Sequence, residues 1–427
     1  MKFVLAGYGT RGDVEPSVAV GRELQRRGHD VRMAVPPDLV GFVEAAGFAT
    51  VAYGLDTHAL LDAHRDFWTG VSRNFWKIPE LIRLGRKIWE ITTRCWREMN
   101  TTLTSLADGA DLLSIAALNF EQPAANVAEY YDIPLATLHH SPLRPNGQLG
   151  PALPAPVMRS AMAAYDWLYW LLTKRVEDGQ RRELGLPRAT RPSSRRIARR
   201  GSLEIQAYDE VCFPGLAAEW AKWDGPNGPL RPFVGALTME LTTDADNDIA
   251  SWIAAGTPPI FFSFGSMPVE SPADAVAMID AACAQLGERA LVCAAGSDFS
   301  DVGHSDHVKV VGTANYAAVF PACHAVVHHG GAGTTAIGLR AGVPTLILWT
   351  APDQSLWGAA VTRLEVGATR SFSATTRDSL VADLRRILAP EYVARAREIA
   401  TRMTKPAASV ESAADLLEDL ARVRCVG

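Results

Sequence analysis

A run of histidines, glycines and threonines between residues 328 and 335 is the most chemically suggestive segment of the sequence. It reads His-His-Gly-Gly-Ala-Gly-Thr-Thr and follows a short apolar run. Glycines let backbone N–H groups approach a ligand, and the start of a helix carries the positive end of the helix dipole. A lone histidine at a strand end is more often structural, but two beside three glycines favour an anion site. The candidate phosphate contacts are His328, His329, Gly331, Gly333 and Thr334.

Two further segments would face the same site. Asp353-Gln354 follows the apolar run 345–349, and a carboxylate beside an amide suits the hydroxyls of a sugar. The alternative is a helix cap before Leu356. Ser266 follows the apolar strand 260–264 and a glycine, so it could donate a hydrogen bond to phosphate from the opposite side. An ordinary turn residue is an equal alternative there.

The N-terminal segment Gly7-Tyr8-Gly9-Thr10-Arg11-Gly12 matches the dinucleotide-binding pattern G-x-G-x-x-G. Asp13 follows the third glycine directly and would repel a pyrophosphate, and the second strand ends in prolines instead of an acid. We therefore interpret Asp13 as a general base for an acceptor hydroxyl, or as a helix N-cap with equal weight. Thr10 would orient this carboxylate or cap the turn, and Gly12 belongs to the same loop.

Apolar runs and glycine or proline breaks predict the elements that position these residues. Strands are expected at 2–7, 29–35, 49–53, 111–117 and 135–138 in the first half, and at 260–264, 290–294, 308–311, 325–328 and 345–349 in the second. A loop is expected from Gly9 to Pro16, and helices between the strands. This alternation predicts an α/β protein with two Rossmann-like, doubly wound domains that face a central cleft.

The predicted boundaries are a first domain at 1–224, a linker at 225–240 and a second domain at 241–405. A helix at 406–427 could pack back on the first domain. The 427 residues carry a net charge of −5, which argues against nucleic acid as a partner. Six scattered cysteines and no apolar run of membrane-spanning length predict a cytoplasmic protein.

Together these segments resemble the GT-B inverting glycosyltransferases, above all bacterial antibiotic, sterol and cell-envelope glycolipid glycosyltransferases. The resemblance rests on residues 9–16, 264–267, 328–335 and 353–358. It implies that Asp13 is the catalytic base, that His329 and its neighbours hold the donor diphosphate, and that Asp353 and Gln354 hold the donor sugar. Ser266 matches a serine of the same site. No cofactor or metal ion is implied, since the nucleotide sugar is a co-substrate.

One part of the resemblance departs from the family. Where the family often has an aromatic residue that stacks on the nucleobase, this sequence has Thr313, Ala314, Asn315 and Tyr316. The donor could therefore be a UDP or a dTDP sugar. Asp244 and Asp246 could mimic a metal-binding Asp-x-Asp, but their polar flanks favour a solvated loop. A non-catalytic sugar-nucleotide-binding partner and an epimerase of the same fold are the alternative functions.

The acceptor is expected to be lipophilic. Residues 64–100 are rich in large aromatics, for which core packing is the favoured interpretation, although several could line an acceptor site. His139 and His140 end a strand and could contact the acceptor or be structural. The segment from Arg181 to Arg200 has eight arginines; a solvated, mobile loop is the usual interpretation, and contact with anionic membrane lipids is the alternative.

Overall fold

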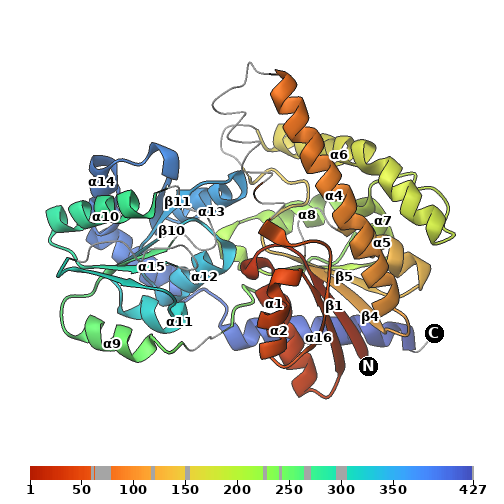
Figure 1. Cartoon of the computed structure of the whole chain (residues 1–427), viewed down its shortest axis with the longest axis horizontal. Coiled ribbons are helices and arrows are strands. Elements are labelled where there is room, and N and C mark those ends of the chain that lie inside the picture. Colours follow the sequence, from red (N-terminus) through yellow and green to blue (C-terminus); the bar gives the residue numbers. More distant parts are fainter. Residues whose placement is uncertain are drawn as a thin grey trace.

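The computed structural model describes residues 1–58, 62, 78–116, 121–149, 154–224, 228–239, 243–263, 271–294 and 305–425. Within these residues the chain forms two six-stranded parallel sheets, one in each half of the sequence (Figure 1). Helices cover the faces of both sheets, as parallel sheets require because their strands are apolar on both faces. The predicted fold class of two doubly wound α/β domains is confirmed.

The first sheet has the strand order β3-β2-β1-β4-β5-β6. Its strands are β1 (Lys2–Gly7), β2 (Asp30–Val35), β3 (Ala49–Ala52), β4 (Leu112–Ala116), β5 (Leu135–His139) and β6 (Leu203–Gln206). Its helices are α1 (Arg11–Arg26), α2 (Val40–Ala45), α4 (Ile78–Leu106), α5 (Glu121–Tyr130), α6 (Ala155–Glu183), α7 (Ser193–Arg199) and α8 (Leu216–Asp224). The order reverses between β1 and β4, so the loop after β1 lies at the point where such sheets bind ligands.

The second sheet has the order β12-β11-β10-β7-β8-β9 and repeats this design. Its strands are β7 (Ile260–Ser263), β8 (Ala290–Cys293), β9 (Val308–Val311), β10 (Ala325–His328), β11 (Thr345–Trp349) and β12 (Gly367–Ser371). Its helices are α9 (Asp246–Ala254), α10 (Pro272–Leu286), α11 (Tyr316–Val319), α12 (Ala332–Ala341), α13 (Pro352–Arg363), α14 (Arg377–Ile387) and α15 (Pro390–Ala400). The strand order here reverses at β10 and β7, which places the loop after β10 at the equivalent point.

The C-terminal helix α16 (Pro406–Cys425) packs mainly against the first domain, with α1 and β4 as its main neighbours. Its Ala413 and Leu417 join the core formed by β1, β2 and α1. His29 and Glu418 are hydrogen-bonded at 2.8 Å between the two parts. In the predicted linker, Leu230 and Phe233 bridge to β6, so this segment begins as an extension of the first sheet.

Two strands and one helix start differ from the predictions. The loop expected from Gly9 to Pro16 is shorter, because α1 already begins at Arg11. Strands β6 and β12 were not predicted; β6 buries Glu204 and Gln206, and β12 is a short edge strand with a threonine, an arginine and a serine. Neither has the apolar run that marks the other strands.

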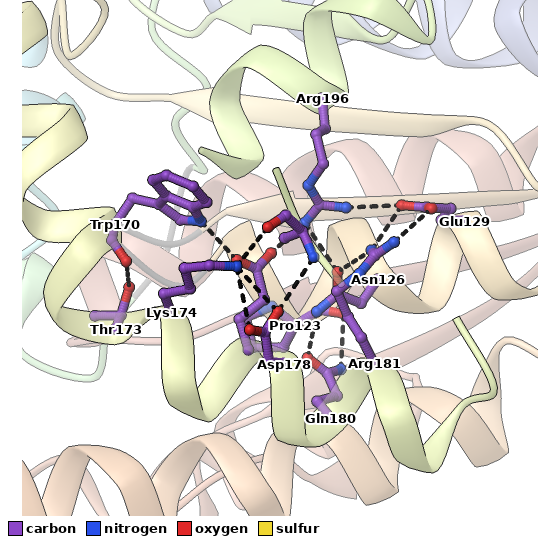
Figure 2. A network of polar contacts seen from close by, with 12 residues as sticks. Pro123, Asn126, Glu129, Trp170, Thr173, Lys174, Asp178, Gln180, Arg181 and Arg196 are labelled. Atoms are coloured by element: carbon purple, nitrogen blue, oxygen red, sulfur yellow. Dashed lines mark hydrogen bonds and ion pairs between the residues drawn. The ribbon is translucent and has the colours of Figure 1, made fainter. Parts of the chain in front are cut away.

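The arginine-rich segment is folded, and its interpretation as a mobile loop is wrong. It comprises the end of α6 and the helix α7, and its Arg181 and Arg196 enter a polar network with α5 (Figure 2). Arg181 donates two hydrogen bonds of 2.8 Å to Glu129 and one of 2.9 Å to Asn126. Arg196 donates to the same two residues at 2.7 and 2.9 Å and to the buried Glu177. These arginines therefore join helices α5, α6 and α7.

None of the described helices combines the length and the apolar character needed to cross a membrane. Of the aromatic residues between 64 and 100, Trp96 is buried in the core beside Tyr8 and Tyr53, as the packing interpretation predicted. Trp89 is 39% exposed. Phe67, Trp68, Phe75 and Trp76 lie outside the described residues.

Candidate active site

The carboxylate of Asp13 is held at the start of α1 by a reciprocal cap. Its Oδ2 accepts hydrogen bonds from the backbone N–H of Thr10 at 2.7 Å and from the Thr10 hydroxyl at 2.9 Å. Gly9 has φ of +139°, and a Cβ there would lie 2.3 Å from this oxygen, so only glycine leaves room for the carboxylate. Within the described chain both hydrogen bonds end on Oδ2, which leaves Oδ1 for a ligand. Asp13 therefore caps the start of α1, and this role is compatible with a second one as a general base.

His140, which the sequence left open, lies beside Asp13. Burial lowers the pKa of His140, while the charge and the backbone of Asp13 act in the opposite direction. The net effect keeps the imidazole neutral near pH 7. Its Nε2 is buried and has no hydrogen-bond partner among the described residues. His139 is structural instead, since it is buried and hydrogen-bonded to Thr137 at 2.9 Å.

The two histidines after β10 have different surroundings. His328 is fully buried, and its Nδ1 accepts the N–H of Gly330 at 3.0 Å, so it shapes the turn from within and has no surface for a ligand. His329 is partly exposed, and burial lowers its pKa to about 4, so it is neutral near pH 7. Its Nδ1 has no hydrogen-bond partner among the described residues. Of the two, only His329 is placed to meet an anion.

Helix α12 begins at this turn without a side-chain cap. Its N-cap residue is Gly331, whose backbone is extended, and no side chain in the described part of the chain bonds the first N–H groups. Gly333 is exposed and Thr334 half-buried in the first turn. Thr335 is instead committed to the helix, because its hydroxyl donates to the Gly331 carbonyl at 2.8 Å. The open N–H groups and the dipole of α12 suit a negatively charged ligand.

Asp353 and Gln354 begin α13, next to this turn. Gly330 has φ of +99°, and a Cβ there would lie 2.9 Å from the Gln354 carbonyl oxygen, so the two loops are in close contact. The Gln354 Oε1 accepts from the backbone N–H groups of Thr350 and Ala351 at 2.8 and 3.1 Å. The helix-cap alternative is therefore realised by Gln354, while Asp353 stays exposed.

Charges of the two domains meet at this point. The pKa of Asp353 is raised, first by desolvation from the surrounding protein and then by the negative charge of Asp13 on the other domain. Burial also raises the pKa of Tyr316, and the charge of Arg11, next to Thr10, opposes this shift. The start of α1 therefore lies near the starts of α11 and α13 across the domain boundary.

The segment expected to meet the nucleobase is only partly open. The ring of Tyr316 stacks on Phe320 with centroids 5.1 Å apart, and its hydroxyl pairs with Ser263 at 2.7 Å. It therefore contributes to the core of the second domain. Thr313 is exposed and Asn315 half-buried. Ser266 lies outside the described residues.

The Asp-x-Asp segment also has a structural explanation. Asp246 accepts hydrogen bonds from the Thr243 backbone at 2.9 Å and from the Asn315 backbone at 3.2 Å. It thus links the first turn of α9 to the loop before α11. Asp244 lies in the turn before α9, as the interpretation as a loop predicted, whereas Asp246 already belongs to the helix.

Two parallel sheets with loops at their switch points, one of them a glycine-rich helix start, have the layout of the GT-B fold. A protein of Mycobacterium tuberculosis named "Uncharacterized glycosyltransferase Rv1524" is 61% identical over 425 residues, which are 99% of each chain. A Mycobacterium leprae protein, "Uncharacterized glycosyltransferase ML2348", is 59% identical over 99% of this chain and 97% of its own. The chain belongs to the same family of glycosyltransferases as these mycobacterial proteins.

Family models agree with this assignment in each half of the chain. The N-terminal domain of glycosyltransferase family 28 matches residues 3–109, and the C-terminal domain of erythromycin biosynthesis protein CIII-like proteins matches residues 275–421. A sterol 3-beta-glucosyltransferase of Arabidopsis thaliana is 27% identical over 94% of this chain and 65% of its own.

Solved structures show the same fold over the whole chain. The glycotransferase of kitacinnamycin has a TM-score of 0.72 at 18% identity, covering 98% of this chain and 99% of its own. The glycosyltransferase VinC, solved in complex with dTDP, has a TM-score of 0.64 at 18% identity and full coverage of both chains.

Proposed function

We propose that this glycosyltransferase moves a hexosyl or deoxyhexosyl group from a UDP or dTDP sugar to a hydroxyl of a lipophilic acceptor, with inversion. The observation that carries the proposal is the position of Asp13 at the start of α1, from which its negative charge acts on Asp353 of the other domain. The glycosyltransferase VinC, which shares this fold and was solved in complex with dTDP, supports the choice of a UDP or dTDP sugar as donor.

In the proposed mechanism Asp13 takes the proton of the acceptor hydroxyl as that oxygen attacks the anomeric carbon. The new C–O bond forms opposite the bond to the β-phosphate oxygen, which breaks, so one displacement inverts the configuration. The start of α12 and the neutral His329 donate hydrogen bonds to the departing diphosphate. Asp353 accepts hydrogen bonds from sugar hydroxyls. Since the start of α12 and His329 bind the diphosphate in this mechanism, it includes no metal ion.

Replacing His329 by alanine tests the diphosphate site. A hydrogen bond to a charged group contributes about 1.5–3 kcal/mol, so the Kd for dTDP or UDP should rise about 10–100-fold. Isothermal titration of both nucleotides measures this and also decides the nucleobase. His324→Ala is a matched control, because His324 lies in the same domain, is partly exposed and pairs with Glu288. Equal affinities of wild type and His329→Ala would remove His329 from the site.

Gly331→Ala tests the same site without removing a polar group. The added Cβ would lie 2.7 Å from the His329 Nε2, and the side-chain end must turn away. Gly331 has an ordinary extended backbone, so the thermal midpoint should change little. We expect weaker nucleotide binding, by about as much as in His329→Ala. An unchanged Kd would show that the position of this ring does not matter.

Turnover of the donor separates the proposal from its alternatives. A transferase releases nucleoside diphosphate faster when an acceptor is added. An epimerase of this fold would convert the donor at the same rate without acceptor, and a non-catalytic partner would not convert it at all.

A further inference from the structure

The long helix α6 is amphipathic in the reverse of the usual sense. The side chains it buries include Thr173, Glu177, Gln180 and Arg181. The side chains it exposes include Tyr165, Leu168, Leu171 and Leu172, which are 57–64% accessible. In a water-facing helix the leucines would point inward and the charges outward. An arrangement of this kind indicates surroundings other than water on the outer side.

The polar inner face of α6 forms hydrogen bonds with the neighbouring helices α5 and α7. Figure 2 shows Asn126 and Glu129 of α5 and Arg196 of α7 meeting this face. Glu177 also accepts the indole N–H of Trp170 at 2.9 Å. If α6 rotated to turn its leucines inward, these bonds would break, and the charged side chains of α5 and α7 would lose their partners. The apolar face is therefore fixed outward.

The exposed apolar stripe is long and uncharged, and it leads into basic residues. Val157, Ala161, Leu168 and Leu172 recur at helical spacing along one side, and the exposed residues between 155 and 172 carry no charge. Arg175 and Arg182 follow Val157 by about five and seven helical turns, so they continue the same side, and both are exposed. The order is an apolar stripe followed by positive charge.

Neighbouring helices extend this character. Arg159 of α6 stacks on Trp223 of α8 at 4.2 Å, and Trp223 is 59% exposed. Helix α4, which contacts α6, exposes Ile82 and Trp89 together with basic residues (Arg83, Arg86 and Lys87). Aromatic and aliphatic side chains among basic ones suit the headgroup region of a bilayer.

We propose that the outward face of α6, from Val157 to Arg182, docks the protein on an anionic lipid bilayer. The leucines and Tyr165 enter the boundary between headgroups and acyl chains, while Arg175 and Arg182 meet anionic headgroups. The helix begins in the segment that follows β5 and His140, so its apolar start lies on the first domain (Figure 1). The docking face thus differs from the basic segment that the sequence suggested, of which only the first part belongs to it.

Sedimentation with lipid vesicles tests the proposal. The full-length protein should bind vesicles of phosphatidylcholine mixed with phosphatidylglycerol. The double variant Leu168→Ser/Leu172→Ser should bind about a hundredfold more weakly, since each buried leucine contributes roughly tenfold. Arg175→Gln should weaken binding about fivefold on the mixed vesicles and leave binding to phosphatidylcholine alone unchanged. Leu230→Ser is the control, because Leu230 is 68% exposed but lies in the linker segment, outside α6.

Thermal unfolding checks that the variants are folded, and the replaced leucines are exposed, so their midpoints should match the wild type. The proposal is overturned if the wild type binds neither vesicle or if the double variant binds as the wild type does. It is also overturned if analytical ultracentrifugation shows a wild-type dimer that the double variant abolishes, since a second copy would then cover this face. None of these results depends on the transfer reaction.

Discussion

Asp13→Asn should lower the rate of glycosyl transfer by about 10²–10⁴-fold, the usual contribution of a general base. An asparagine oxygen can still accept the two hydrogen bonds from Thr10 that the Asp13 Oδ2 accepts, so the start of α1 should stay intact. What is lost is the ability to take the acceptor proton. The measurement is release of nucleoside diphosphate with a hydroxylated lipophilic acceptor, and titration of dTDP or UDP should give an unchanged Kd.

Glu15→Gln is the matched control for this experiment. Glu15 lies two residues further along the same helix and accepts the backbone N–H of Met239 at 3.2 Å, which a glutamine can also do. Transfer should therefore remain near the wild-type rate. If Asp13→Asn retained full activity, Asp13 would be a capping residue alone, and the second interpretation of its position would stand.

The fold could be predicted wherever local sequence determines local structure. Ten of the strands follow short apolar runs that end at glycine, proline or polar residues, and they were predicted within a few residues. Strand β6 was missed because it buries Glu204 and Gln206, which read as solvent-exposed. The start of α1 was missed because Pro16 reads as a helix breaker, whereas the cap between Thr10 and Asp13 starts the helix earlier.

The candidate site divides in the same way. The glycine-rich turn and the carboxylate after β1 have local patterns, so the sequence could name them. The opposition of Asp13 and Asp353 is a product of two domains meeting, and only the resemblance to a known family could suggest it. His140 joins the site because β5 pairs with β4, which in turn pairs with β1, a neighbourhood that strand order creates. The sequence could not predict which of the two neighbouring imidazoles, His328 or His329, is buried in the protein.

Charge runs were the least reliable guide. Arg181 and Arg196 look like part of a solvated basic segment, yet they pair with Glu129 of α5, more than 50 residues earlier. The segment from Arg181 to Arg200 contains the arginines of this network, whereas their partner Glu129 lies far away in the sequence. The outward leucines of α6 were hidden for the same reason, since the hydrophobic pattern of a helix does not say which face its neighbours cover.

Glu204→Gln should destabilise the fold by about 3–5 kcal/mol at pH 7, the usual cost of breaking a buried ion pair. Glu204 is fully buried in β6 and accepts hydrogen bonds from Arg144 at 2.9 Å and Arg231 at 2.6 Å. A neutral glutamine leaves these two guanidinium groups with less opposing charge. Urea denaturation measures the change. Glu398→Gln, which removes an exposed partner of Arg395, should change stability by no more than about 0.5 kcal/mol.

The same glutamate makes the stability depend on pH in a defined window. Burial by itself raises the pKa of Glu204, but Arg144 and Arg231 outweigh burial and bring it to about 2 from an ordinary 4.5. Because folding lowers this pKa, the ionised form stabilises the fold above about pH 4.5, and the contribution is lost as pH falls toward 2. The variant lacks the group, so its difference from wild type should shrink over this window. A difference that stays constant from pH 7 to the lower end would mean that the charge of Glu204 does not stabilise the fold.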